Sequence, residues 1–262
     1  MNGYRCIACN TEQGVDYDGF VCPSCGGNLD VTYDYAAIDP AFGDGEGMFR
    51  YASLLPCSDP GTTLPLTIGG TPLHRARRLG ATAGLGNVWL KDETGNPSAS
   101  IKDRASAVAL LRAAATGADT VAVASTGNAG SSTACVAAAM GLRAVVFVPE
   151  TAPAAKLTQS LAYGARVLAV RGSYDDAYDL CLRACEGQGW FNRSTGFNPF
   201  TREGKKTSSF EIWEQLGEVP DRVIIPTGDG NILSGSWKGW CDLHAAGLID
   251  RLPKIDCAQS KG

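Results

Sequence analysis

Several features that mark common functional classes are missing from this 262-residue sequence. No apolar run approaches the ~20 residues that cross a bilayer, and the first residues, Met1 to Arg5, lack the apolar region of a signal peptide. The net charge is −4, and no basic cluster is interleaved with aromatic side chains. We therefore expect a cytoplasmic protein that binds neither nucleic acid nor membrane.

Two nucleotide-binding motifs are also absent. The sequence contains neither G-x-x-x-x-G-K-[ST] nor G-x-G-x-x-G, so nucleoside triphosphates and dinucleotides are not favoured as ligands. What it does contain is 44% hydrophobic and 19% charged residues, the balance of an ordinary globular protein. This length and composition predict one large or two modest domains with a sizeable core.

Four of the ten cysteines lie close together near the start of the chain. They form two C-x2-C pairs separated by twelve residues, Cys6 with Cys9 and Cys22 with Cys25. Four thiolates at this spacing can close a tetrahedral Zn²⁺ site with no open position for water, which predicts a structural role. Disulfides or free thiols are the alternative. The six scattered cysteines are expected to be small buried hydrophobic residues.

Lys102 stands where a loop of small residues runs into a predicted helix. The loop reads Asn-Pro-Ser-Ala-Ser-Ile over residues 96–101, and apolar residues then recur at helical spacing to residue 115. A helix start and burial both lower the pKa of a lysine amine and make it nucleophilic. Lys102 is therefore a candidate to anchor an aldehyde cofactor as a Schiff base. Alternatively, it is a solvated lysine paired with Asp103.

Short apolar runs alternate with helix-length segments in the middle of the chain. The predicted strands are 120–124, 143–148 and 166–170, and the predicted helices are 129–140, 154–163 and 174–188. Because strand and helix alternate, we expect an α/β fold with a parallel sheet. A later strand, 222–226, precedes a helix over 233–243, and the run 254–258 reads as a further strand.

Two loops follow the carboxyl ends of these strands, where such sheets bind ligands. Ser125, Thr126 and Gly127 could hold a carboxylate with hydroxyls and backbone N–H groups, and the Asn128 amide could reach a ring oxygen of a cofactor. A capped helix start without a ligand is the alternative. The second loop, 228–232, has glycines that let backbone amides close on a phosphate, although Asp229 adds an unfavourable negative charge.

These motifs, in this order, resemble the fold-type-II pyridoxal-phosphate (PLP) enzymes, most closely the threonine synthase group. The family pattern N-P-[TS]-x-S-x-K-D-R matches residues 96–104, with Ala99 where glycine is usual. The resemblance implies that Lys102 forms the Schiff base and that Asn128 faces the phenolic oxygen of the cofactor. It further implies that the cofactor phosphate is bound by the loop residues Gly228, Asp229, Gly230, Asn231 and Ile232.

Further matches point to the threonine synthase group in particular. They are Lys156-Leu157-x-Gln159, Asn198-Pro199 followed by Glu203-Gly204-Lys205-Lys206-Thr207, and a cysteine ribbon leading into Tyr33-Asp34-Tyr35. The resemblance implies a tryptophan synthase β-like architecture of two three-layer α/β domains behind a zinc ribbon, and a possible homodimer. The expected division is 1–34 for the ribbon, 35–103 for a linker and the first part of the larger domain, 104–189 for the smaller domain and 190–262 for the rest of the larger domain.

Only residues 233–262 follow the second loop, so we expect the carboxyl-terminal part of the family fold to be missing. That part carries the residue that contacts the pyridine nitrogen of the cofactor. No residue in 233–262 can be given this role from the sequence.

By resemblance, the chain is a threonine synthase-like lyase that converts O-phosphohomoserine and water to threonine and phosphate. Lys102 would act as the base, Ser125, Thr126 and Gly127 would bind the substrate carboxylate, and Lys156 would bind the leaving phosphate unless it is a solvated helix lysine. One alternative is β-elimination or β-replacement on serine-like or phosphoserine-like substrates. Another is a catalytically impaired fragment that binds zinc and a ligand.

Overall fold

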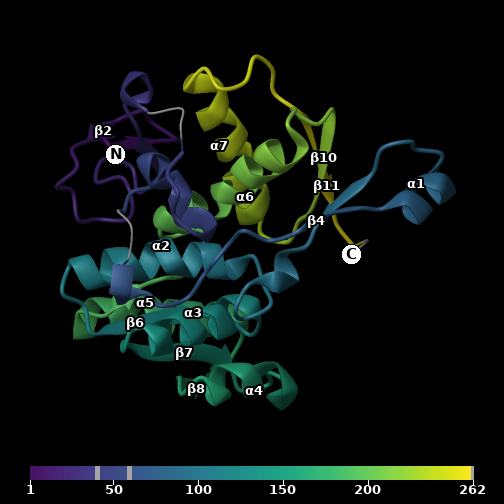
Figure 1. Cartoon of the computed structure of the whole chain (residues 1–262). Coiled ribbons are helices and arrows are strands. Elements are labelled where there is room, and N and C mark those ends of the chain that lie inside the picture. The colour runs from purple at the N-terminus through teal and green to yellow at the C-terminus, as the bar shows by residue number, and fades with distance from the viewer. Residues whose placement is uncertain (39–41, 58–60, 261–262) are drawn as a thin grey trace.

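The computed structural model describes residues 1–38, 42–57 and 61–260. Figure 1 shows a lower layer built on a four-stranded sheet and an upper layer that contains two long helices, with helix α2 (Lys102–Ala115) running between them. The amino-terminal segment packs beside the upper helices, and a small arm projects on the opposite side (Figure 1). None of the described helices is long and apolar enough to cross a bilayer.

The four-stranded sheet is parallel and has the order β8-β7-β6-β9. Its strands are β6 (Thr120–Ala124), β7 (Arg143–Pro149), β8 (Arg166–Val170) and β9 (Phe191–Asn192), and its helices are α3 (Asn128–Ala139), α4 (Ala154–Ala162) and α5 (Tyr174–Gln188). Every residue of β6 is buried, as expected for a parallel strand covered on both faces. The predicted alternation is confirmed, but the two-residue strand β9 was not predicted.

Helix α6 (Phe200–Leu216) lies between α2 on one side and α7 (Asn231–Ala245) on the other. The approach is close enough to require glycine. A Cβ atom on Gly204 would lie 1.9 Å from the backbone oxygen of Arg104 in α2, and one on Gly239 of α7 would lie 2.4 Å from the backbone oxygen of Lys206. Beside α7, strands β10 (Arg222–Pro226) and β11 (Lys254–Ala258) pair in parallel. The predicted bounds of both strands are confirmed.

The amino-terminal ribbon is a three-stranded antiparallel sheet of β1 (Gly3–Cys6), β2 (Glu12–Gln13) and β3 (Leu29–Thr32). It packs on the two upper helices. Arg202 of α6 donates a 2.6 Å hydrogen bond to the Leu29 oxygen, and Lys238 of α7 donates a 2.9 Å bond to the Val31 oxygen. The ribbon is therefore joined to α6 and α7 by hydrogen bonds from helix side chains to its backbone oxygens.

The segment after the ribbon contributes more to the core than a surface linker would. In the 3-10 turns of η2 (Gly47–Leu54), Met48, Tyr51 and Leu54 are fully buried. The chain then forms the projecting arm, in which β4 (Leu73–Arg75) pairs antiparallel with β5 (Trp89–Lys91) around helix α1 (Arg77–Ala83). Apolar residues in this segment do not recur at helical or strand spacing, so the sequence did not indicate which positions are buried.

A buried ion network centred on Arg104 connects the arm, α2 and α6. The fully buried guanidinium donates two hydrogen bonds of 2.6 and 2.7 Å to the Glu211 carboxylate of α6, and others of 2.8 and 2.9 Å to Glu93. Lys91 of β5 adds a 2.6 Å bond to Glu211. Burial alone would raise the pKa of Glu211, but Arg104 and then Lys91 outweigh it and lower that pKa to about 2.

This lowered pKa predicts a specific loss of stability in acid. The Glu211 pKa rises from about 2 in the folded state to 4.5 on unfolding, so the carboxylate stabilises the fold above pH 4.5. As pH falls from 4.5 towards 2, about 3 kcal/mol of unfolding free energy should be lost. Urea unfolding measured along this pH range should show this loss in the wild type, with a weaker pH dependence in Glu211→Gln.

The matched control is Glu218→Gln, which changes an exposed glutamate beyond the end of α6. It should keep the wild-type profile, whereas Glu211→Gln should also be destabilised at pH 7 because Arg104 loses a charged partner. Parallel acid profiles for wild type and Glu211→Gln would contradict the assignment.

Candidate active site

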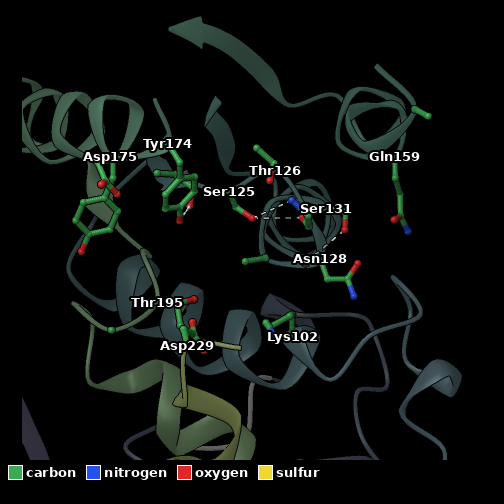
Figure 2. A pocket seen from close by; sticks show the side chains of 16 residues that line it. Lys102, Ser125, Thr126, Asn128, Ser131, Gln159, Tyr174, Asp175, Thr195 and Asp229 are labelled. Carbon is green, nitrogen blue, oxygen red and sulfur yellow. Dashed lines mark hydrogen bonds between the residues drawn. The ribbon is translucent and has the colours of Figure 1, made fainter. Parts of the chain in front are cut away.

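A cavity of about 940 Å³ opens where β6 ends and α2 and α3 begin. Figure 2 shows Lys102 and Asp229 on one side of it and Ser125, Thr126 and Asn128 on the other. Its lining residues are Lys102, Ala124, Ser125, Thr126, Gly127, Asn128, Ala129, Ser131, Ala155, Gln159, Tyr174, Asp175, Tyr178, Thr195, Gly196 and Asp229. The cavity has the size of a typical small-molecule site.

Lys102 is the first residue of α2 and is half-buried in this cavity. Burial is the main cause that lowers its pKa, the Arg193 guanidinium lowers it further, and Asp229 opposes both. Asp103 does not pair with Lys102, because its carboxylate accepts hydrogen bonds from the Ser98 backbone N–H at 2.6 Å and the Ser98 hydroxyl. The contact between Asp103 and Ser98 closes the loop that precedes Lys102.

The loop after β6 faces Lys102 across the cavity. Ser125 and Thr126 are half-buried there, and helix α3 begins at Asn128 without a side-chain cap. The Gly130 N–H already donates to the Gly127 oxygen at 2.9 Å, which leaves the N–H groups of Asn128 and Ala129 in the first turn to bind an anion. The Gly127 N–H contacts the Ser125 hydroxyl at 3.2 Å. The three sequence-predicted residues 125–127 and Asn128 are thus on one wall.

The second loop reaches the cavity through Asp229 alone. Gly228, Gly230, Asn231 and Ile232 do not line it, although Gly230 has the left-handed φ of 77° that starts α7. The Asp229 carboxylate turns back to accept a 3.0 Å hydrogen bond from the Asn231 N–H. The negative charge of Asp229 therefore lies at a helix start, where it is stabilised.

Two buried cations beneath the cavity were not predicted. Arg193 donates hydrogen bonds to the Ser106 and Thr195 hydroxyls at 3.2 and 2.9 Å, and Lys205 donates one to the Asn231 side-chain oxygen. Burial lowers the pKa of Arg193 to about 10 against the opposing charges of Asp103 and Asp229. Lys205 lies in the family match at residues 203–207, but neither residue was assigned a role from the sequence, because their surroundings come from distant segments.

Other lining residues come from helices whose starts were predicted. Gln159 of α4 donates a 3.2 Å hydrogen bond to the Ser98 oxygen, and Tyr174 of α5 donates a 3.1 Å bond to the Ala124 oxygen. The capping box of Ser173 and Asp176 was the signal that could have placed Tyr174 at the carboxyl edge of the sheet. The Lys156 side chain lies outside the part that the structure describes.

The four ribbon cysteines gather at a separate site. Their sulfurs lie within 4.8 Å of one another, with Cys6–Cys25, Cys9–Cys22 and Cys9–Cys25 separations of 3.5, 3.6 and 3.4 Å. Tetrahedral zinc–thiolate geometry requires sulfur separations of about 3.8 Å. A Cβ on Gly27 would come within 3.0 Å of the Cys6 sulfur, so glycine leaves the cluster room. The arrangement fits a metal ion.

The fold and the lysine-lined cavity define the structural class. Maize serine racemase superposes with a TM-score of 0.63 at 24% identity, covering 73% of this chain and 56% of that protein. O-ureido-L-serine synthase gives a TM-score of 0.62 at 28% identity, covering 73% and 60%. The α/β fold is thus the fold-type-II PLP-enzyme fold, as the sequence predicted.

A sequence model of the family described as "Pyridoxal-phosphate dependent enzyme" matches residues 64–260. The chain belongs to this PLP-dependent enzyme family.

Two relatives named threonine synthase match most of the chain. The protein from Methanocaldococcus jannaschii is 39% identical over 218 residues, which are 82% of this chain and 54% of the relative. The protein from Mycobacterium leprae is 37% identical over 213 residues, which are 81% and 59%. The chain therefore spans just over half the length of these curated relatives.

The backbone at Ala99 yields a stability prediction. Ala99, in the loop before Lys102, has a φ of 59°, a left-handed conformation that strains a residue with a Cβ atom. Ala99→Gly should therefore raise the free energy of unfolding by about 1 kcal/mol. Urea unfolding at neutral pH measures the change.

The control is the same substitution in a regular helix. Ala114→Gly in α2 should lower the free energy of unfolding by about 1 kcal/mol, because glycine costs backbone entropy there. A destabilised Ala99→Gly protein would show that its loop is not strained as described.

Proposed function

We propose that this chain carries the cofactor and substrate site of a threonine synthase-like PLP-dependent lyase, acting on O-phosphohomoserine. The observation that carries the proposal is that Lys102 and residues 125–128 line one cavity from the starts of two different helices. The name of the two relatives, threonine synthase, supports threonine as the product, and the choice of substrate rests on the family resemblance. A cytoplasmic location and a homodimer are further predictions from the sequence.

The residues present fit the cofactor. Lys102 offers a primary amine to the cavity and Asn128 offers an amide for the ring oxygen. The proposed phosphate loop is Gly228, Asp229, Gly230, Asn231 and Ile232, of which Asp229 lines the cavity and the others lie beside it at the start of α7. When bound, PLP supplies an electron sink that stabilises negative charge at the substrate α-carbon. We assign the cofactor-binding role to these residues.

Lys102 is also the proposed base. Its lowered pKa increases the fraction of neutral amine, and only the neutral form can take a proton. The Lys102 nitrogen would take the α-proton and hold it close to the site of its later transfer.

Ser125, Thr126 and Gly127 would orient the substrate by its carboxylate. The two hydroxyls and the open N–H groups at the start of α3 supply neutral donors, which bind an anion without a counter-charge. Lys156 of α4 is proposed, from the family resemblance, to bind the leaving phosphate. Together these contacts would place the α-carbon towards Lys102.

The test compares substrates on the purified chain loaded with PLP. O-phosphohomoserine should change the absorbance of the bound cofactor and release phosphate faster than serine or threonine releases ammonia. Lys102→Ala should abolish the yellow band and the borohydride-trapped cofactor peptide. Spectroscopy, a phosphate assay and peptide mapping measure these outcomes.

Lys254→Ala is the control, because it removes an exposed lysine of β11 that lies outside the cavity. It should still trap the cofactor at Lys102. Trapping on a different lysine would refute the anchor, and faster deamination of serine would favour the β-elimination function.

We further propose that Cys6, Cys9, Cys22 and Cys25 hold one structural Zn²⁺. The sulfur separations support four ligands on one ion, and four thiolates leave no position for water. The ribbon is too small for an adequate core, so the metal would supply folding free energy.

Metal analysis of protein from zinc-replete cells should find about one zinc per chain. Cys9→Ser should lose the zinc and loosen the ribbon, while cofactor trapping at Lys102 is largely retained because the two sites are separate. Cys257→Ser, at an exposed cysteine of β11, should keep the metal. A metal-free wild type with disulfides among the four cysteines would disprove the zinc site.

A further inference from the structure

Lys205 of α6 differs from the other buried lysines near it. Lys206 contacts the Glu203 and Asp242 carboxylates, both at 2.6 Å, and Lys238 contacts Asp242 at 3.4 Å. Lys205 is fully buried, yet among the described residues it forms no salt bridge, and its amine donates only to the side-chain oxygen of Asn231. A buried lysine without a counter-ion is costly to the fold.

The charges that face Lys205 come from four segments and are mostly positive. Burial is the main cause that lowers the pKa of Lys205. The positive charges of Arg193, which follows β9, of Lys102 in α2 and of Arg202 in α6 lower it further, and only Asp229, before α7, raises it. Arg202 has a carboxylate partner in Asp30 at 3.2 Å. Lys102 and Lys205 therefore face one negative charge, that of Asp229, whereas Arg193 also faces Asp103.

The hydrogen bond from Lys205 to Asn231 determines how the Asn231 side chain is oriented. A charged lysine amine can donate hydrogen bonds but cannot accept them. The Asn231 oxygen therefore faces Lys205, and the Asn231 NH₂ group must point elsewhere. Asn231 is the first residue of α7, whose start follows the glycines of the 228–230 loop. Lys205 thus lies behind a helix start that already attracts anions.

We propose that Lys205 is the buried counter-charge for the phosphate of the cofactor, acting through Asn231 at the start of α7. The inference rests on the proposed function, because it requires PLP to occupy the cavity. Lys205 is a positioning residue: it orients the Asn231 amide and balances the charge of the phosphate and of Asp229.

The experiment compares PLP with pyridoxal, which has the same ring and aldehyde but no phosphate. In Lys205→Met the dissociation constant of PLP should rise roughly 10- to 100-fold, while that of pyridoxal stays within about twofold of wild type. The unliganded variant should unfold at no lower urea concentration than wild type, because methionine needs no counter-ion.

Ser208→Ala is the matched control, since it truncates another buried polar side chain of α6 whose hydroxyl only contacts the Lys205 backbone oxygen. It should bind PLP as wild type does. Equal loss of PLP and pyridoxal affinity in Lys205→Met would reveal a structural role and overturn the proposal, as would unchanged PLP affinity. An increased requirement for O-phosphohomoserine at unchanged PLP affinity would assign Lys205 to the substrate phosphate instead. A wild type that bound no PLP would remove the proposed function and this inference together.

Discussion

The ion pairs of the Arg104 guanidinium hold together the segments that carry the cavity. Arg104 lies two residues after Lys102, and its carboxylate partners come from the arm, through Glu93, and from α6, through Glu211. Buried charges of this kind stabilise a structure only when every partner is present, so the network tolerates little displacement. Asn96 extends the constraint towards the loop, because its side chain contacts both Glu93 and the Gly69 N–H. The position of Lys102 is thereby tied to charges outside the cavity.

Helix α6 is the element that relates the ribbon to the cavity. Glu203 accepts a hydrogen bond from Tyr33, which follows β3, and forms an ion pair with Lys206 of its own helix. One turn further along, Thr207 and Glu211 contact Arg104, while Lys205 points to the start of α7. A helix with so many charged residues would be expected at the surface. Here each charge has a defined neighbour in a different part of the chain, which explains a buried helix with a polar sequence.

Local patterns in the sequence predicted the parts of the structure that local interactions determine. The turns at Cys6 and Cys22, the loop before Lys102 and the strand ends at Ser125 and Asp229 lie where their spacing indicated. Helix α6 was not predicted, because burial of its charged face removes the amphipathic periodicity by which helices are recognised. Glu211 and Arg104 are 107 positions apart, and Lys205 meets Asn231 across 26 positions. Such pairs depend on tertiary packing, so neither the ion network nor the buried cations could be found from neighbouring residues.

The close contact at Gly204 has a consequence for how the site could vary among related sequences. The backbone of α6 touches that of α2 directly, and adding one methyl group at position 204 would force the two helices apart. Lys102 begins one of these helices and Lys205 lies on the other, so the same methyl group would move the Lys102 amine away from Lys205 and the loop 228–232. The absence of a side chain at residue 204 thus sets the distance between α2 and α6, and with it the space available to a ligand between them.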